Sequence, residues 1–122
     1  MKKPRPDAVR EDRIHEQAIV DAYGPEEQAR GWYYYLENKI RFPFAAKCIA
    51  AASLSPLRNG ETVSVRRLAP EPACAHDMLV SVAWQGRNLA IPLSQLMPVD
   101  PDPSTQEAIG DWHYWVARGY LL

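Results

Sequence analysis

The sequence predicts an α+β domain, a small antiparallel β-barrel of the Src homology 3 or Tudor type flanked by two N-terminal helices and one C-terminal helix. Two observations support this prediction. Apolar residues recur at helical spacing in residues 8–41 and 104–119, whereas residues 43–99 alternate between apolar and polar positions and are broken by turn signals. Short strands joined by tight turns would close into a barrel most economically, because closure removes exposed sheet edges.

The chain has 122 residues, a length that fits a single domain. Its composition, 47% hydrophobic and 24% charged, is that of an ordinary globular protein, and no apolar run approaches the ~20 residues of a membrane span. Residues 1–7 are charged and interrupted by proline, so we expect them to be disordered. No apolar stretch follows this basic start, as a signal peptide would require, and we expect a cytoplasmic protein without membrane contact.

Residues 8–41 predict two amphipathic helices. Asp7 can cap the first helix and Gly24 ends it, and Pro25 then suits the first position of the second helix. The apolar face of the second helix consists of Ala29, Trp32, Tyr33, Leu36 and Ile40. Successive helical residues point about 100° apart, so the four aromatic residues 32–35 cannot form one flat stacking surface. We therefore expect this run to supply core packing.

The strand block, residues 43–99, contains turn signals between apolar runs. Residues 44–52 predict a partly buried strand, although their alanines could equally be helical. Val63 and Val65 alternate with polar residues after the turn at Asn59-Gly60. The clearest strand is 78–84, and it leads into a hairpin in which Gly86 takes the positive-φ position.

The final helix, residues 104–119, is predicted from a capping box formed by Ser104 and Glu107. Gly119 is predicted to end this helix. Its apolar stripe consists of Ala108, Trp112, Trp115 and Val116, which turns Asp111, His113 and Arg118 towards water.

Charge and motifs exclude several classes of function. Fourteen Lys and Arg against fifteen Asp and Glu give a net charge of −1, which removes the electrostatic argument for nucleic-acid binding. Phosphate-cradling glycine loops and serine-elbow motifs are absent, which argues against a nucleotide-using or hydrolytic enzyme. Cys74 and His76 are the one short cluster that suggests a zinc or thiol site. A zinc site would need Cys48 and Asp77 brought in from elsewhere, so buried free thiols are the simpler interpretation.

Several segments together resemble one family. They are Gly31–Asn38, Phe42-Pro43-Phe44 with Ala46 and Cys48, Ser55-Pro56-Leu57, Trp84–Arg87, Ile91–Leu96 and Asp111–Trp115. These segments are similar to those of the small bacterial calcium-binding protein family typified by the cyanobacterial calcium-sequestering protein. The resemblance implies reversible binding of calcium, with the calcium ion as partner, and in the cyanobacterial member a buffering role. That member is strongly acidic and this chain is nearly neutral, so the family pattern implies weaker binding here.

The carboxylates match no calcium-loop pattern, so a calcium site would have to be assembled from separate segments. Chain position gives five candidate ligands. Glu37 and Asn38 end the aromatic helix, Glu71 and Asp77 flank a loop stiffened by proline, and Asp111 lies on the outer face of the last helix. These five residues could converge if the last helix returns beside the second.

The leading hypothesis is a non-enzymatic calcium-binding or calcium-buffering protein. The alternative is a module that binds a protein or peptide without metal through its small barrel and aromatic rim. A metal-dependent or thiol enzyme that uses Cys74 and His76 is the third class.

Overall fold

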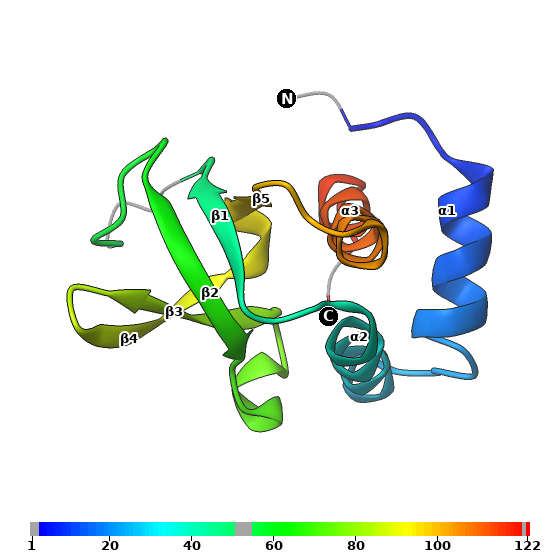
Figure 1. Cartoon of the computed structure of the whole chain (residues 1–122). Helices are drawn as coiled ribbons and strands as arrows, with labels where there is room; N and C mark the ends of the chain where they lie inside the picture. Colours follow the sequence, from blue (N-terminus) through cyan, green and yellow to red (C-terminus); the bar gives the residue numbers. More distant parts are fainter. Residues whose placement is uncertain (1–2, 51–54, 121) are drawn as a thin grey trace.

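Three α-helices and a five-stranded antiparallel sheet make up the computed structural model, which describes residues 3–50, 55–120 and 122. The helices lie together at one end of the molecule and the sheet at the other (Figure 1). The α+β prediction, with helical segments before and after the strand block, is confirmed.

The two N-terminal helical segments meet at a tight turn. Helix α1, Ala8–Arg13, is capped by Asp7, whose carboxylate accepts a hydrogen bond from the Arg10 backbone N–H at 3.1 Å. It continues as a π-helical turn, η1, Ile14–Ala18, and the chain then reverses at Asp21, which has a φ of 52°. Helix α2, Pro25–Lys39, begins at Gly24. Gly24 was predicted to end the first helix, but Asp21 makes the turn instead, because Asp tolerates the left-handed region better than most residues.

The sheet is formed by five strands in the order β4-β3-β2-β1-β5. The strands are β1 Phe44–Cys48, β2 Thr62–Leu68, β3 Leu79–Trp84, β4 Arg87–Pro92 and β5 Leu96–Pro98. Ala45 and Ala46 belong to β1, so the alanine run is extended; its predicted continuation through 51–52 lies outside the described residues. The hairpin between β3 and β4 is confirmed, and both of its turn residues have positive φ, 48° at Gln85 and 75° at Gly86.

Closure of the sheet into a barrel is not confirmed. In the described part of the chain β4 and β5 stand at opposite ends of the strand order, and each pairs on one side only. The pairing of β2 with β3 shifts register between Val65 and Arg67. This irregularity leaves Arg66 and Arg67 both exposed and returns Leu68 to the core, which simple alternation does not predict.

Helix α3, Pro103–Ala117, packs beside α2, and the two helices lie between the sheet and α1 (Figure 1). Its N-cap is Asp102, which accepts from the Thr105 backbone N–H at 3.4 Å. The predicted capping box is wrong, because the Ser104 hydroxyl donates instead to the Lys39 carbonyl at 2.8 Å. Trp112 packs edge-on against Trp32 of α2 with ring centroids 5.0 Å apart. The aromatic run of α2 is therefore part of the scaffold, as predicted.

Two short 3-10 turns connect the remaining elements. The turn η2, Glu71–Cys74, follows β2 and contacts α2, and η3, Leu93–Gln95, follows β4 and contacts α3. The irregular segment before α1 is bonded to the C-terminal end of α3, because Arg118 Nη1 donates to the Pro4 carbonyl at 3.0 Å. None of the helices described is long and apolar enough to cross a membrane.

Candidate functional site

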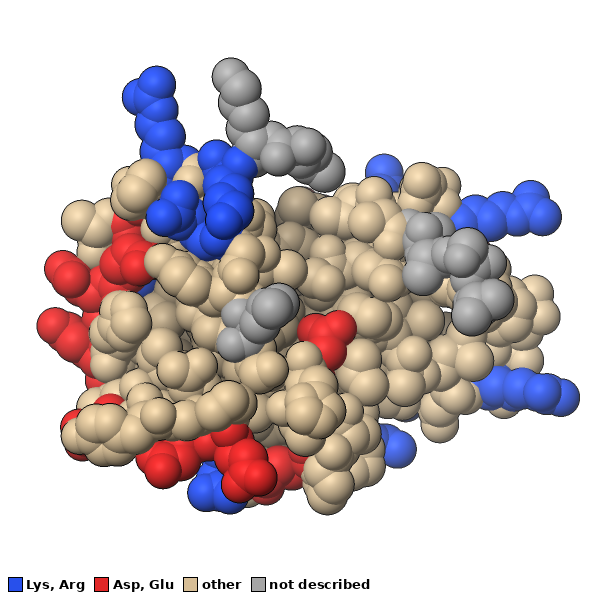
Figure 2. All heavy atoms as spheres, turned by 180° about the vertical axis from the view of Figure 1, so that it is seen from behind, with Lys and Arg blue, Asp and Glu red and all other residues tan. Residues whose placement is uncertain are grey.

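Acidic side chains are concentrated in the two N-terminal helical segments. Residues 11–37 contain seven Asp and Glu but only two Arg and no Lys. Figure 2 shows acidic side chains gathered along the left and lower edges of the molecule, the side on which α1 and α2 lie in that view. Lys and Arg side chains project from the sheet end and also gather at the upper left. Because a divalent cation is attracted by the summed local field, this side of the molecule is where a metal site is expected.

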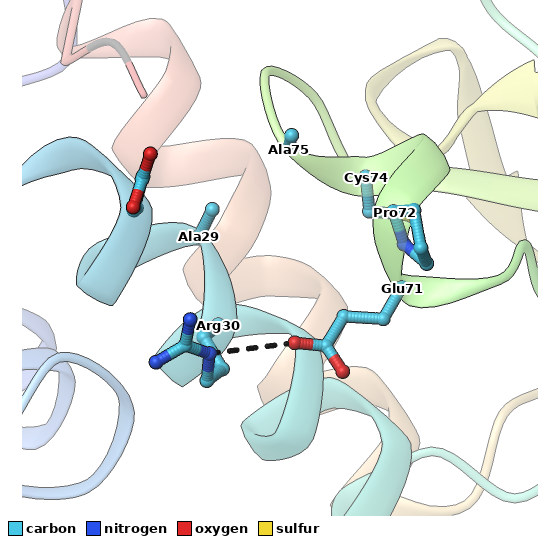
Figure 3. A pocket seen from close by; sticks show the side chains of 7 residues that line it. Ala29, Arg30, Glu71, Pro72, Cys74 and Ala75 are labelled. Atoms are coloured by element: carbon cyan, nitrogen blue, oxygen red, sulfur yellow. Dashed lines mark ion pairs between the residues drawn. The ribbon is translucent and has the colours of Figure 1, made fainter.

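Glu71 is the best-placed carboxylate on this side. It begins η2 and faces α2, where the Tyr34 hydroxyl donates to Glu71 Oε2 at 2.7 Å and Arg30 Nε lies 3.5 Å from Glu71 Oε1. Figure 3 shows this ion pair across a groove between α2 and η2. The groove has a volume of about 220 Å³ and is lined by Glu26, Ala29, Arg30, Glu71, Pro72, Cys74 and Ala75. A carboxylate at the edge of an open groove can receive a hydrated cation.

Glu37 lies further along α2, one turn beyond Tyr33 and Tyr34. It lines a neighbouring hollow of about 270 Å³ with Tyr33, Phe42, Arg67, Leu68 and Pro70. Burial is the main cause of the raised pKa of Tyr33, and the negative charges of Glu37 and Glu71 both add to it. The pKa of Tyr34 is also raised, mainly by its hydrogen bond to Glu71 and further by Glu37. Both carboxylates therefore act on the same two tyrosines. Asn38 is exposed on the next position of α2.

Asp77 lies in a different hollow. This space of about 180 Å³ is lined by His76, Asp77, Ser94, Trp112, Trp115, Val116, Tyr120 and Leu122. Burial raises the pKa of Asp77 above its usual value. Its neighbours there are largely aromatic residues of α3, so the structure does not bring Asp77 together with Glu37.

Asp111 is fully buried, and the prediction that it faces water is wrong. Its carboxylate accepts hydrogen bonds from Arg10 Nη1 at 2.7 Å, from Arg13 Nε and Nη2 at 2.8 and 2.7 Å, and from the Tyr35 hydroxyl at 2.7 Å. Burial alone would raise the pKa of Asp111, but the bonds from Arg13, Tyr35 and Arg10 lower it below its usual value. This carboxylate holds α1 and α2 against α3.

Glu37 and Glu71 thus line two different hollows but act on the same two tyrosines, Asn38 follows Glu37 on α2, and Asp77 and Asp111 lie apart from them. Within residues 3–50, 55–120 and 122, no three His, Cys, Asp or Glu side chains are gathered as a metal site. Sequence reasoning missed Glu26, Arg30 and Tyr34, which surround Glu71. The sequence did contain a signal that Glu26 and Arg30 lie close together, since they are four residues apart on one predicted helix.

Cys74 and His76 do not form a nucleophile and base pair. The Cys74 thiol is buried, lies 3.6 Å from the Leu79 carbonyl and 3.9 Å from the Ala69 carbonyl, and has a pKa raised chiefly by burial. His76 is exposed. Cys74 and Cys48 are both free and buried, which agrees with the simpler interpretation of these thiols.

Fold and site together define a small α+β protein with exposed carboxylates along α2 and a groove beside Glu71. A family model described as calcium binding, that of CcbP, matches residues 12–116. The crystal structure of CcbP from Anabaena is 42% identical over 100% of both chains, with a TM-score of 0.88. A calcium-binding protein in its calcium-binding form is 42% identical over 98% of both chains, with a TM-score of 0.86. No curated protein matches the chain. The chain belongs to the CcbP family of calcium-binding proteins, which confirms the resemblance noted in its sequence.

Proposed function

We propose that this chain binds Ca²⁺ reversibly and acts as a non-enzymatic calcium-binding protein of the cytoplasm. The observation that carries the proposal is the 42% identity, over nearly the whole chain, to a protein in its calcium-binding form. The surplus of acids in residues 11–37 supports it, because a divalent ion is drawn to a surface of one sign of charge.

The site is proposed at the surface of α2 and η2. Glu71 and Glu37 supply the carboxylates, and Asn38 supplies an amide oxygen. Ca²⁺ takes six to eight oxygen ligands in flexible geometry, so Glu26, backbone carbonyls and water complete the shell. Asp77 and Asp111 are left out of the proposed set. The four donor atoms on Asp111 come from two arginines and a tyrosine, and a cation could not approach without displacing them.

Arg30 sets the expected strength of binding. It is the only Lys or Arg in residues 14–38, and its guanidinium pairs with Glu71. Ca²⁺ must therefore displace a resident cation from its principal ligand. With few carboxylates and this competitor, we expect a Kd of about 0.1–1 mM, the range of the weakest protein calcium sites.

Titration calorimetry with CaCl₂, and separately with MgCl₂, tests this proposal. We expect Ca²⁺ to bind and Mg²⁺ to bind more weakly, because Mg²⁺ demands a rigid octahedral site. Glu71→Gln and Glu37→Gln each remove one charged ligand and should weaken binding roughly ten-fold. Arg30→Gln should strengthen it by up to ~5-fold, the value of an exposed ion pair.

Asp12→Asn is the matched control, because Asp12 is an exposed carboxylate on α1 away from the groove. Equal weakening by Asp12→Asn and Glu71→Gln would show that only overall charge matters. Absence of calcium heat, together with an unchanged melting temperature at several millimolar CaCl₂, would refute calcium binding itself.

A further inference from the structure

An exposed apolar surface lies where η1 turns into α2. Three large side chains are exposed there, Val20 at 55%, Tyr23 at 87% and Tyr34 at 47%. Beside them is an open hollow of about 350 Å³ lined by Val20, Asp21, Ala22, Glu27, Arg30, Gly31 and Tyr34. We call these residues, with Tyr23, the junction patch. Clustered exposed apolar groups bordered by polar ones mark interaction surfaces more often than isolated ones do.

The backbone under the junction patch is closely packed. A Cβ added at Gly31 would lie 2.2 Å from the Ala18 carbonyl oxygen, so α2 rests directly on the end of η1. Ala18 and Ile19 are buried on the inner side of the turn, and the Ala22 N–H donates to the Ile19 carbonyl at 3.2 Å. The turn is thus anchored by its own core residues, and the same anchoring directs Val20 and Tyr23 outwards.

The charge of the junction patch is negative. Asp21 and Glu27 line the hollow, and Glu26 follows on the same first turn of α2. The one cation there, Arg30, is paired with Glu71 across the neighbouring groove. Figure 2 shows acidic side chains gathered along the left and lower edges of this helical side, with a group of Lys and Arg side chains above them.

We propose that the junction patch binds a segment of a partner protein that carries one or two large apolar side chains flanked by Lys or Arg. Apolar groups fill the hollow between Val20 and Tyr34, and the flanking cations meet Asp21, Glu26 and Glu27. A second copy of this chain is a poorer occupant, since a two-fold contact would place the same acidic patch opposite itself. The junction patch borders the proposed calcium site and shares Arg30 and Tyr34 with the surroundings of Glu71, and Glu26 serves in both proposals. Its apolar contacts do not require a bound Ca²⁺, so the two proposals can fail independently.

The test uses ¹⁵N-labelled full-length protein and three synthetic peptides of equal length. The first has a Leu-Phe pair flanked by Lys and Arg, the second has the same pair flanked by Glu, and the third has the basic residues without the apolar pair. We expect only the first to bind, with amide shifts centred on Val20, Tyr23 and Tyr34. The titration is run in calcium and in chelator, so that failure of calcium binding and failure of this proposal are distinguishable.

Tyr23→Ser should weaken binding of the first peptide about ten-fold, as truncation of an aromatic anchor does, and Asp21→Asn should weaken it less. Met97→Ser is the matched control, an exposed apolar residue on β5 at the sheet end, and should change nothing. The proposal is overturned if the purely basic or the acidic peptide binds as well as the first, or if the shifts lie elsewhere. It is also overturned if these amides shift with protein concentration alone, which would indicate a second copy.

Discussion

Replacement of Asp111 by Asn should destabilise the protein more than any exposed carboxylate replacement. The Asp111 side chain is 0% exposed, whereas its partners Arg10 and Arg13 are 33% and 18% exposed. Breaking a buried ion pair costs about 3–5 kcal/mol, and because both guanidinium groups can recover some water contact, we expect about 2–3 kcal/mol. With a urea m-value of roughly 1–3 kcal/mol/M, the midpoint of unfolding should fall by about 1–3 M.

Urea unfolding followed by far-UV circular dichroism measures this change, with Glu107→Gln as control. Glu107 pairs with Arg13, at 3.4 Å, and also with Lys39, but its side chain is 41% exposed, so its replacement should lower the free energy of unfolding by only about 1 kcal/mol. The pH dependence gives a second check. The pKa of Asp111 is lower in the folded state than its ordinary value of about 3.9, so its contribution is present above that pH and lost as pH falls further. The reasoning would be refuted if Asp111→Asn lowered the free energy of unfolding no more than Glu107→Gln does. It would also be refuted if the difference between wild type and Asp111→Asn were the same at pH 3 as at neutral pH.

Three further predictions concern the fold. Asp102→Ala should cost about 1 kcal/mol because Asp102 is the N-cap of α3, and Ser104→Ala should cost less; the reverse order in urea unfolding would restore the capping-box interpretation. Gly31→Ala should lower the free energy of unfolding by about 1–3 kcal/mol or more, because the added Cβ would overpack against the Ala18 carbonyl. Gly24→Ala, with open space around it, should change this free energy by less than about 1 kcal/mol, and equal melting temperatures of the two variants would contradict the prediction. Cys48 and Cys74, both buried, should react with a thiol reagent only at the rate of unfolding, and rapid labelling of the native protein would contradict their burial.

Local patterns predicted the elements that depend on neighbours in sequence. The hairpin between β3 and β4 follows from alternation and a glycine turn, and Trp32, Tyr33 and Leu36 were correctly assigned to the core. The N-cap of α3 was misplaced by two residues, because Asp102 and Ser104 are both good caps and only tertiary contact with the Lys39 carbonyl decides between them.

The site depended on packing that periodicity does not show. Asp111 is polar by pattern but is buried because α1 covers the face of α3 that would otherwise meet water, and Arg10 and Arg13 compensate its charge. Conversely, Glu37 and Glu71 are distant in sequence, and both act on Tyr33 and Tyr34 only because η2 returns to α2. One helix face taken alone contains no information on which element will cover it.

A crystal grown in CaCl₂ tests the central claim most directly. An anomalous difference map should place a Ca²⁺ ion about 2.3–2.6 Å from carboxylate oxygens of Glu71 and Glu37, with Arg30 turned away from Glu71. A calcium ion bound elsewhere would contradict the proposed site, and a map without any ion from crystals that diffract well at saturating CaCl₂ would contradict calcium binding.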